Sequence, residues 1–566
     1  FFFQPEDGIR DFCLSRGLGD VYKRQLDNGT VDNIVTRFPP EPNGYLHFGH
    51  AKAICLNFGL AKKFNGICHL RMDDTNPEKE TDEFVNSIIK SVRWLGFDYG
   101  DHLYYASDYF DTFFECAKAF IRNNLAYVDS QNSEQIRENR GTLTQPGLDS
   151  KFRDRSVDEN LEIFEKMKTG LFQAGEHVLR AKIDMKSPNL NMRDPILYKI
   201  RHVKHHRQAD KWCIYPLYDF AHPLSDAIEK ITHSICTLEF EDHRPIYNWV
   251  VKSASFCGFF KNQVLPRQFE FARLNIESLV LSKRKLTEVV DTKVVKNWSD
   301  PRMPTLEGAK TRGYPPEGFI KFNQLIGVTK SASTIEKGLL EECMREHLNK
   351  TVKRKICVIS PLRLIIENLE ENFSEDCSVR NHPQDKSLGE RIVQFGKNLY
   401  IERSDFQVNP AKDFFRLRPG GLVRLKYAFV AECTGYEEKD GLITSVTVKI
   451  FKDSKSGTSG SNNYKVKGNI HWLNESTAKT CRLNIYHNLF TQNSGNLNQT
   501  SDEEMLLNKH SLETLSAFIE QSAVNEEIGT PFQFERHGYF ILANKTNKNR
   551  VEFGRIISLK DSWKKW

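Results

Sequence analysis

Two histidines flank a Phe-Gly pair where a predicted strand and a Pro-rich loop give way to a helix: His47, Phe48, Gly49 and His50. Exposed backbone N–H groups and the helix dipole at such a point favour bound phosphate. The imidazoles can donate hydrogen bonds to charge that develops on a phosphorus centre, and Gly49 leaves room for a nucleotide. Alone, the pattern is more often a pair of surface histidines beside a tight turn. The preceding loop TRFPPEPNGYL adds an arginine, a glutamate and an asparagine, which favours the phosphate interpretation.

A second group of side chains that could bind phosphate lies far along the chain, in VLSKRK at residues 280–285. It follows the strand-like run RQFEFARLNI. A lysine brought over a triphosphate could stabilise the departing pyrophosphate as negative charge moves onto it. By itself the segment is a basic run, which is typical of a solvated helix end. Its meaning therefore depends on the first group.

The elements around the first group follow the order strand, loop, helix, strand. The successive segments are VDNIVTRF, PPEPNGYLHFGH, AKAICLNFGLAKKF and ICHLRM, the last of which ends at Asp73 and Asp74. This order is a βαβ unit, and such units build parallel sheets with a ligand crevice at the carboxyl ends of the strands. Strand-like segments resume at 211–240 in KWCIYPLYDF and CTLEF, so an inserted module is expected to split the sheet.

The inserted stretch carries helical patterns, one of them near Val157–Lys168, and the polar segment SEQIRENRGTLTQPG. Helical patterns dominate 276–350, and short β-rich runs beyond about residue 355 predict β-barrels. Two Ser/Gly/Asn-rich stretches, Ser454–Asn463 and Gln492–Ser501, are expected to be surface loops. The histidines at 202, 205 and 206 lack acidic or Cys partners at ligand spacing, so a solvated or RNA-facing patch is expected rather than a metal site.

The length of 566 residues predicts about three to five folded units. The net charge of +6 does not by itself require nucleic acid. Twelve scattered cysteines without a C-x-x-C pair indicate reduced thiols. No apolar run reaches the roughly 18–20 residues that cross a bilayer, so a soluble, cytoplasmic protein is expected. Residues 1–25 resemble translated sequencing-adapter read-through, and a disordered tail is the alternative.

Together, the two phosphate-type segments resemble the HIGH and KMSKS motifs of class I aminoacyl-tRNA synthetases. From about residue 30 the chain is most similar to the glutaminyl-tRNA synthetases, on collinear strings that include RFPPEPNGYLHFGHAKAICLNFG, LRMDDTNPEKE, YVDSQNSEQIRENRGTLTQPG, KWCIYPLYDFAHPLSDAIEKITHSICTLEF and SDPRMPT. The KMSKS segment departs from the consensus at Val280, Leu281 and Arg284. The phosphate role in that segment therefore falls to Lys283, with Arg284 as a potential helper.

The resemblance implies a multidomain α/β plus all-β fold. Its expected parts are a non-native or disordered tail (1–25), a Rossmann-type catalytic core in two halves (26–106 and 211–275), an inserted tRNA acceptor-end binding domain (107–210), a KMSKS-type loop with a helical domain (276–350) and two anticodon-binding β-barrels (351–566). The implied reaction joins L-glutamine to tRNA(Gln) through a glutaminyl-adenylate and releases AMP and diphosphate. ATP enters with Mg²⁺, no protein side chain is expected to bind a structural metal, and the chain is expected to work as a monomer without a membrane.

By resemblance, the catalytic residues are His47, His50 and Lys283. The ATP site is expected to comprise Glu41, Pro42, Asn43, His47, Phe48, Gly49, His50, Ala51, Lys52, Ala53, Thr237, Arg273, Leu274, Leu281, Ser282 and Lys283. The glutamine site is expected to comprise Arg37, Asp73, Tyr218 and Cys236. A carboxylate at Asp73 can hold an α-ammonium group, with a turn or cap as the alternative. The Tyr218 hydroxyl can both donate to and accept from a carboxamide, although a Tyr after a Pro is more often part of a core.

The contacts with tRNA are likewise implied by resemblance, at Leu143, Asp242, Arg354, Arg416, Gln533 and Arg536. Leu143 falls in a loop whose apolar side chain wedges the first acceptor base pair apart, with a buried loop leucine as the alternative. The last four residues fall at anticodon-contacting positions, where an ordinary surface role is the alternative. The match is imperfect around Phe415, so Arg416 is the weakest of these assignments.

Three other functions compete with this interpretation. A glutamyl-tRNA synthetase of archaeal or eukaryotic type shares several strings, but it carries an arginine at the position of Cys236, where an uncharged wall suits an amide. A catalytically inactive, synthetase-like RNA-binding protein would account for the altered KMSKS segment. A plain nucleotidyltransferase would leave the β-rich C-terminal region without a purpose.

Overall fold

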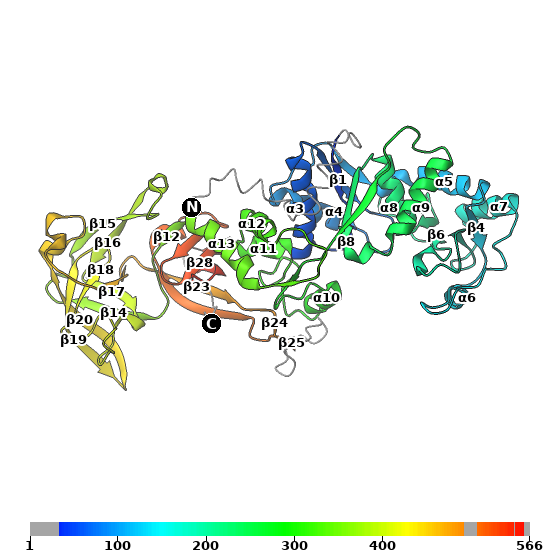
Figure 1. Ribbon diagram of the computed structural model, residues 1–566. Helices are drawn as coiled ribbons and strands as arrows, with labels where there is room; N and C mark the ends of the chain where they lie inside the picture. The colour runs from blue at the N-terminus through cyan, green and yellow to red at the C-terminus, as the bar shows by residue number, and fades with distance from the viewer. Residues whose placement is uncertain (1–32, 492–505, 548–549, 560–566) are drawn as a thin grey trace. The chain divides into compact units, whose positions relative to one another are not determined.

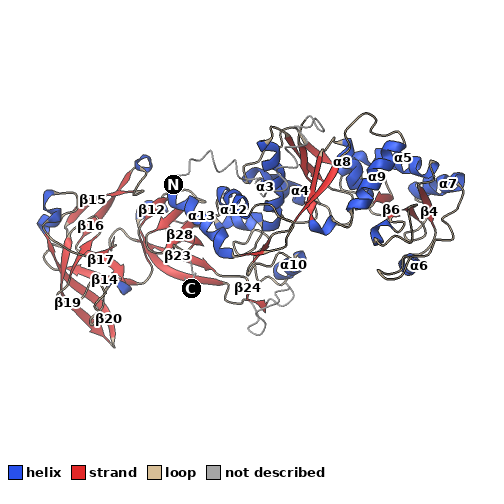
Figure 2. Ribbon diagram, in the orientation of Figure 1, coloured by secondary structure: helices blue, strands red, loops and turns tan. Residues whose placement is uncertain are grey.

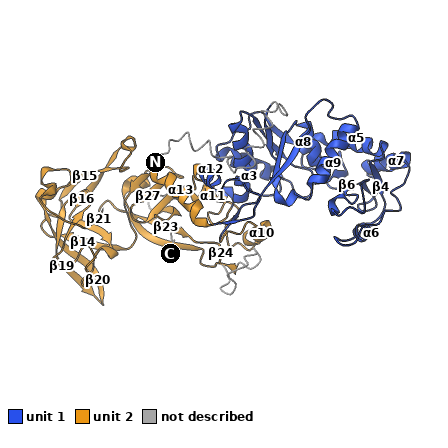
Figure 3. Ribbon diagram, in the orientation of Figure 1, with its two compact units in different colours: residues 1–277, 305–307, 319–335 blue, residues 278–304, 308–318, 336–566 orange. Residues whose placement is uncertain are grey.

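The computed structural model describes residues 33–491, 506–547 and 550–559 (Figure 1). The expected tail at 1–25 and the whole Gln492–Ser501 stretch lie outside the described residues. The chain divides into two compact units, coloured separately in Figure 3. The first comprises residues 1–277, 305–307 and 319–335, and the second comprises residues 278–304, 308–318 and 336–566. Among the described helices, none has the length and apolar character that a bilayer crossing requires.

The first unit contains the predicted βαβ arrangement. Strands β1 (Val35–Phe38), β2 (Ile67–Met72) and β3 (Leu103–Tyr105) run parallel, with α3 (Phe48–Lys63) and α4 (Asp82–Trp94) as the crossover helices. Strands β8 (His233–Thr237) and β9 (Arg267–Phe271) are also parallel, and Thr232 N donates to Val35 O across 3.0 Å, so β8 lies beside β1. The carboxyl ends of these strands therefore share one edge, where α/β sheets bind ligands.

An antiparallel module separates the two parts of this sheet. Its strands are β4 (Ala126–Asp129), β5 (Val178–Ala181), β6 (Ile196–Ile200) and β7 (Ile214–Pro216), in that spatial order. Its helices are α5 (Phe110–Arg122), α6 (Ser133–Asn139) and α7 (Val157–Lys168), with 3₁₀ turns η1 (Ala106–Tyr109) and η2 (Leu190–Met192) (Figure 2). Aromatic side chains fill the core between them, and Phe114 stacks on Phe164 at 4.9 Å between ring centroids.

Two expectations about this region were wrong. The strand-like run KWCIYPLYDF is strand only up to Pro216, because α8 (Tyr218–Ile228) begins two residues later. In CTLEF the strand ends at Thr237, and η3 (Leu238–Phe240) follows. The histidines at 202–206 are not a uniformly solvated patch, since His205 is fully buried and its Nε2 lies 2.8 Å from Asp74 O. The contact with the distant Asp74 backbone holds His205 in the interior, although the local sequence is polar.

The first unit also contains α9 (Arg244–Phe256), which precedes β9. After β9 comes the parallel pair β10 (Asn275–Ile276) and β11 (Thr334–Ile335). Helix α12 (Pro316–Ile326) carries Phe319, whose ring meets Phe48 at 5.0 Å. That contact packs the start of α3 against α12.

The second unit contains α10 (Lys283–Asp291), α13 (Lys337–Thr351), a short helix, α14 (Gln521–Val524), and all but the first two residues of α11 (Leu306–Arg312). One seven-stranded sheet has the order β12-β27-β28-β29-β23-β26-β13, with bounds Lys353–Lys355, Pro531–Phe534, Gly538–Asn547, Arg550–Ile557, Lys479–Tyr486, Leu512–Ile519 and Cys357–Val358. The other has the order β21-β18-β19-β20-β14-β17-β22, with bounds Asn469–Ile470, Leu422–Leu425, Val430–Lys439, Leu442–Phe451, Pro361–Ile366, Asn398–Glu402 and Leu473–Asn474. The two sheets bear out the predicted β-rich C-terminal half.

Smaller pieces complete the second unit. They are the hairpin β15 (Ser374–Arg380) and β16 (Glu390–Gly396), the pair β24 (Phe490–Thr491) and β25 (Leu506–Leu507), and 3₁₀ turns η4 (Lys386–Leu388), η5 (Arg403–Asp405), η6 (Lys452–Ser454) and η7 (Ser459–Asn462). The stretch Ser454–Asn463 is a surface segment, as expected, except at its first residue. Ser454 is fully buried and accepts a hydrogen bond from Val430 N, so it anchors the segment.

Candidate active site

The entry to α3 holds His47 and His50 in a reciprocal cap. His47 Nδ1 accepts from Gly49 N at 3.0 Å, and His50 Nδ1 accepts from His47 N at 3.1 Å. Because each Nδ1 is an acceptor, a neutral ring carries its proton on Nε2. Burial lowers the pKa of His47 to about 4 and the pKa of His50 well below its usual range. Both imidazoles are therefore neutral Nε2–H donors near pH 7.

The loop before this helix is rigid. Asn43 Nδ2 donates to Glu41 Oε2 at 2.5 Å, and Pro40 O accepts from Asp73 N at 3.0 Å. Pro42 is buried and its carbonyl accepts from Thr81 N. Glu41 and Asn43 are more accessible, so within this loop they are the side chains that could meet a ligand.

Within the run His47–Ala53, three side chains pack inward and one reaches across to the next segment of the site. Phe48, Ala51 and Ala53 belong to the protein interior or pack against it. Lys52 Nζ donates to Ala272 O at 2.8 Å, and burial lowers the pKa of Lys52 to about 8. This bond ties α3 to the segment that carries Arg273 and Leu274. Lys52 therefore supports the site rather than presenting its ammonium group to solvent.

The residues expected after β8 and β9 lie at the carboxyl edge of the sheet. Thr237 is the last residue of β8 and is paired in register with Phe271 of β9. Arg273 is largely exposed and forms an ion pair with Glu239 at 3.0 Å, whereas Leu274 is buried. Arg273 is thus the member of this group with a guanidinium available at the surface.

The remaining residues expected in the ATP site belong to the second unit. Ser282 occupies the N-cap position of α10, and Lys283 is the first helical residue and is exposed. Val280, in the preceding turn, is buried in a small core with Leu286 and Val289. An apolar residue at 280 therefore anchors the segment, which accounts for one departure from the consensus.

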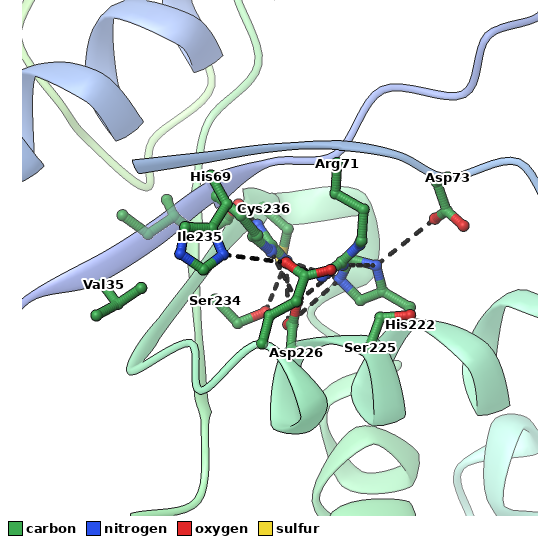
Figure 4. Close-up of polar contacts among 12 residues, drawn as sticks. Val35, His69, Arg71, Asp73, His222, Ser225, Asp226, Ser234, Ile235 and Cys236 are labelled. Carbon is green, nitrogen blue, oxygen red and sulfur yellow. Dashed lines mark hydrogen bonds and ion pairs between the residues drawn. The ribbon is translucent and has the colours of Figure 1, made fainter. Parts of the chain in front are cut away.

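Asp73 and Tyr218 both lie against His222, a residue that the sequence did not single out, and Cys236 lies near Tyr218. Asp73, His222 and Cys236 can be followed in Figure 4. Asp73 is 3% exposed, and its Oδ2 lies 3.6 Å from His222 Nδ1. The Tyr218 ring stacks on His222 at 4.7 Å and contacts Phe240 at 5.0 Å. Burial raises the pKa of the Cys236 thiol to about 12, so the thiol is an uncharged wall.

Arg37 lies behind this group, and its guanidinium is saturated by protein acceptors. Nε donates to Asp226 Oδ1 at 3.1 Å, Nη1 donates to Ile235 O at 2.7 Å, and Nη2 donates to Ser234 Oγ at 2.6 Å. The side chain is fully buried. Although Arg37 is expected in the glutamine site, these contacts indicate a role through its neighbours rather than by direct contact.

Arg37 and Arg71 contact opposite nitrogens of the His222 ring. Arg37 Nη2 lies 2.6 Å from Nε2, and Arg71 Nη2 lies 3.2 Å from Nδ1, which also lies 3.6 Å from Asp73 Oδ2. Burial lowers the pKa of His222. Asp226, between Arg37 and Arg71, has a pKa held far below its usual range: burial opposes ionisation, but the two guanidinium groups and His222 outweigh it.

Two expected tRNA contacts lie on braced loops of the first unit. Leu143 is 78% exposed, and Arg193 Nη1 donates to the carbonyls of Arg140, Thr142 and Gln145 at 2.8–2.9 Å. Leu143 is therefore not the buried loop leucine that was the alternative to a wedge. Asp242 has an exposed side chain, and its carbonyl accepts from Asn189 Nδ2 at 2.8 Å.

Three of the four expected anticodon residues line one cavity of about 870 Å³ in the second unit. Arg354, Gln533 and Arg536 share it with Arg380, Lys426, Lys455 and several acidic groups. Arg536 donates two hydrogen bonds to the buried Asp405, at 2.7 and 2.8 Å. Arg416 reaches the same carboxylate at 3.3 Å but is not among the lining residues. The cavity thus combines cationic and acidic hydrogen-bonding side chains.

Comparisons with known proteins match nearly the whole chain. Residues 33–350 match the catalytic domain of the class I tRNA synthetases (E and Q), and residues 352–450 and 469–543 match anticodon-binding domains of the same group. A glutamine–tRNA ligase of Nitrosomonas europaea is 51% identical over 541 residues, covering 95% of this chain and 96% of its own. A glutamine–tRNA ligase of Polynucleobacter asymbioticus is 49% identical over 580 residues, covering 99% of this chain and 97% of its own.

Proposed function

Because the chain belongs to the class I tRNA synthetases of the glutamate and glutamine group, we propose that it is a glutamine–tRNA ligase. ATP and L-glutamine form glutaminyl-adenylate and diphosphate, and a ribose hydroxyl of the terminal adenosine of tRNA(Gln) then displaces AMP. The observation that carries this assignment is the identity of about 49–51% to ligases of that name over nearly the whole chain. The enzyme is expected to act in the cytoplasm as a monomer.

In the first step the substrate is ATP with Mg²⁺. The glutamine carboxylate attacks the α-phosphorus, and negative charge grows on the phosphate oxygens and on the leaving diphosphate. The neutral Nε2–H groups of His47 and His50 can donate hydrogen bonds to that charge. Lys283 supplies a positive charge for the leaving diphosphate. No protein side chain becomes covalently attached, so catalysis is by positioning and charge stabilisation.

Glutamine is held between a carboxylate and a neutral wall. The buried Asp73 takes the α-ammonium group, while the Tyr218 hydroxyl meets the side-chain amide and Cys236 lines the pocket. A glutamate side chain would need an available cation. Arg37 does not provide one, since Asp226, Ser234 and Ile235 already occupy its donors. An uncharged amide therefore fits this pocket better than a carboxylate.

The tRNA contacts fall into two classes. Leu143 unstacks the first acceptor base pair so that the end of the tRNA can enter the site, and Asp242 lies on the neighbouring surface. Arg354, Gln533 and Arg536 read the anticodon in the cavity of the second unit, where splayed bases can be hydrogen-bonded on their edges.

The test is aminoacylation of total tRNA with labelled glutamine and labelled glutamate in parallel, with diphosphate release followed in the same reactions. A glutamine ligase charges tRNA with glutamine only. Preferential charging with glutamate would assign the chain to the glutamate branch instead. Binding of tRNA without diphosphate release would identify an inactive synthetase-like protein.

A further inference from the structure

Glu402, His471 and His537 form a compact cluster between the two seven-stranded sheets of the second unit. Glu402 is the last residue of β17, and His471 lies between β21 and β22 of the same sheet. His537 lies in the turn between β27 and β28 of the other sheet. The cluster therefore joins side chains from two separately folded sheets, which no sequence spacing would reveal.

The carboxylate of Glu402 is fixed in place by backbone groups. Its Oε1 accepts from Ile359 N at 2.8 Å, and its Oε2 accepts from Ser360 N at 3.1 Å. The residue is 4% exposed.

Both imidazoles approach this carboxylate without satisfying their own hydrogen bonds. His537 Nε2 lies 2.8 Å and His471 Nε2 lies 3.8 Å from Glu402 Oε1. Among the described residues, neither nitrogen of His471 and not the Nε2 of His537 has a hydrogen-bond partner of acceptable geometry. His471 is 1% exposed, so the open positions on its ring face the interior of the protein.

A second cluster of one carboxylate and two histidines differs, because one of its histidines has both ring nitrogens occupied by protein contacts. Asp74, His205 and His206 also lie close together in the first unit. There His205 Nδ1 accepts from the backbone N–H groups of Arg207 and Gln208, and its Nε2 contacts Asp74 O. That ring has no lone pair left for a ligand, so the cluster is a structural hydrogen-bond network.

We propose that Glu402, His471 and His537 bind one divalent transition-metal ion, with zinc as the best match. Imidazole and carboxylate donors suit zinc, and three protein ligands leave a fourth position for solvent. With metal–ligand distances of about 2.0–2.2 Å, donors of a tetrahedral ion lie roughly 3.3 Å apart. The donor atoms here all lie within 4.8 Å of one another, so small side-chain movements complete the site.

The position of the site suggests what the ion does. His537 directly follows Glu535 and Arg536, which line the cavity proposed to read the anticodon. A metal on His537 would hold this turn against the sheet that carries Glu402 and His471, and so would fix the Arg536 guanidinium over Asp405. This consequence rests on the proposed function, whereas metal binding itself does not.

The test is a zinc titration of the full chain, freed of metal with a chelator and then measured in competition with a chromophoric zinc indicator. We expect one tightly bound zinc per chain. His471→Gln and His537→Gln should each weaken that affinity at least tenfold, since each removes one of three ligands. His510→Gln, an exposed histidine of the same unit, is the matched control and should bind like the wild type.

Two further measurements distinguish a lost metal ligand from a misfolded variant. His537→Cys supplies another zinc ligand and should restore binding relative to His537→Gln, while thermal melts of the metal-free proteins check that the variants fold. Stoichiometric binding that survives in folded His471→Gln and His537→Gln, or the absence of stoichiometric binding in the wild type, would overturn the proposal. Because the titration contains no tRNA or glutamine, it can fail or succeed independently of aminoacylation.

Discussion

At the scale of single residues, the tautomer of an imidazole is set by a partner that can only donate. Backbone N–H groups fix the tautomers of His47 and His50. Each of these two imidazoles then keeps its Nε2–H group for the proposed substrates. This pre-orientation is the main contribution that neutral histidines can make to a reaction without general-base chemistry.

Cys236→Arg tests the polarity of the glutamine pocket. A second guanidinium would enter beside Arg37, whose charge is balanced by Asp226, and would have no partner of its own. We expect kcat/KM for glutamine to fall by about 10²-fold with little gain for glutamate. Cys236→Ser, which keeps the wall small and neutral, is the control and should stay within a few-fold of wild type. An unchanged value for Cys236→Arg would place this residue outside the pocket.

The lowered pKa of His47 predicts a stability difference between pH 4 and 6.5. The folded group has a pKa of about 4, against about 6.5 in an unfolded chain, so the unfolded state binds more protons in this window. Stability is therefore complete above about pH 6.5 and falls as the pH drops toward 4. His47→Asn keeps a cap acceptor for Gly49 N and should lose less stability over this window, by about 1–3 kcal/mol. Thermal melts at several pH values measure this, and parallel curves for wild type and variant would contradict it.

At the scale of elements, local patterns predicted the βαβ unit but not its supports. Strand β2 was expected over ICHLRM and spans Ile67–Met72, and α3 begins within three residues of the expected AKAIC start. The strand-to-helix change at Tyr218 was missed because Pro216 and the aromatic residues around it are compatible with either state. Pairs such as Arg37 and Asp226, 189 residues apart, depend on the tertiary fold. The resemblance supplied the site residues, whereas His222 and the Glu402 cluster emerged only from coordinates.

The loop that carries Leu143 yields a prediction about the acceptor end. Arg193 holds three of its carbonyls, so the exposed leucine is presented at a fixed position. Leu143→Ala should lower kcat/KM several-fold for tRNA with an intact first base pair, because the wedge is shortened. Transcripts in which that pair is mismatched should be charged by the variant and by the wild type at similar rates. An equal loss on both kinds of transcript would remove the wedge role.

At the scale of the whole molecule, the two units divide the recognition problem. The residues proposed to bind glutamine, and most of those proposed to bind ATP, lie in the first unit, while Lys283 and the cavity proposed to read the anticodon lie in the second. Either task alone has a generic solution, such as a parallel sheet edge for nucleotides or a barrel surface for single-stranded RNA. The identity of the product depends on both, since the amino acid and the anticodon must agree.

Arg536→Ala tests whether the cavity of the second unit recognises the anticodon. Arg536 lines the cavity and is held by two hydrogen bonds to Asp405, so its guanidinium is positioned before a base arrives. Its loss should reduce charging of cognate transcripts about 10–100-fold while changing charging of anticodon-altered transcripts much less, because a base contact is worth about 1–3 kcal/mol of discrimination. Arg363→Ala is the matched control, since Arg363 is a half-exposed arginine of the same unit that pairs with Glu475 and does not line the cavity. If Arg536→Ala lowered charging of both kinds of transcript by the same factor, Arg536 would contact phosphate rather than a base, because phosphate contacts carry no sequence information.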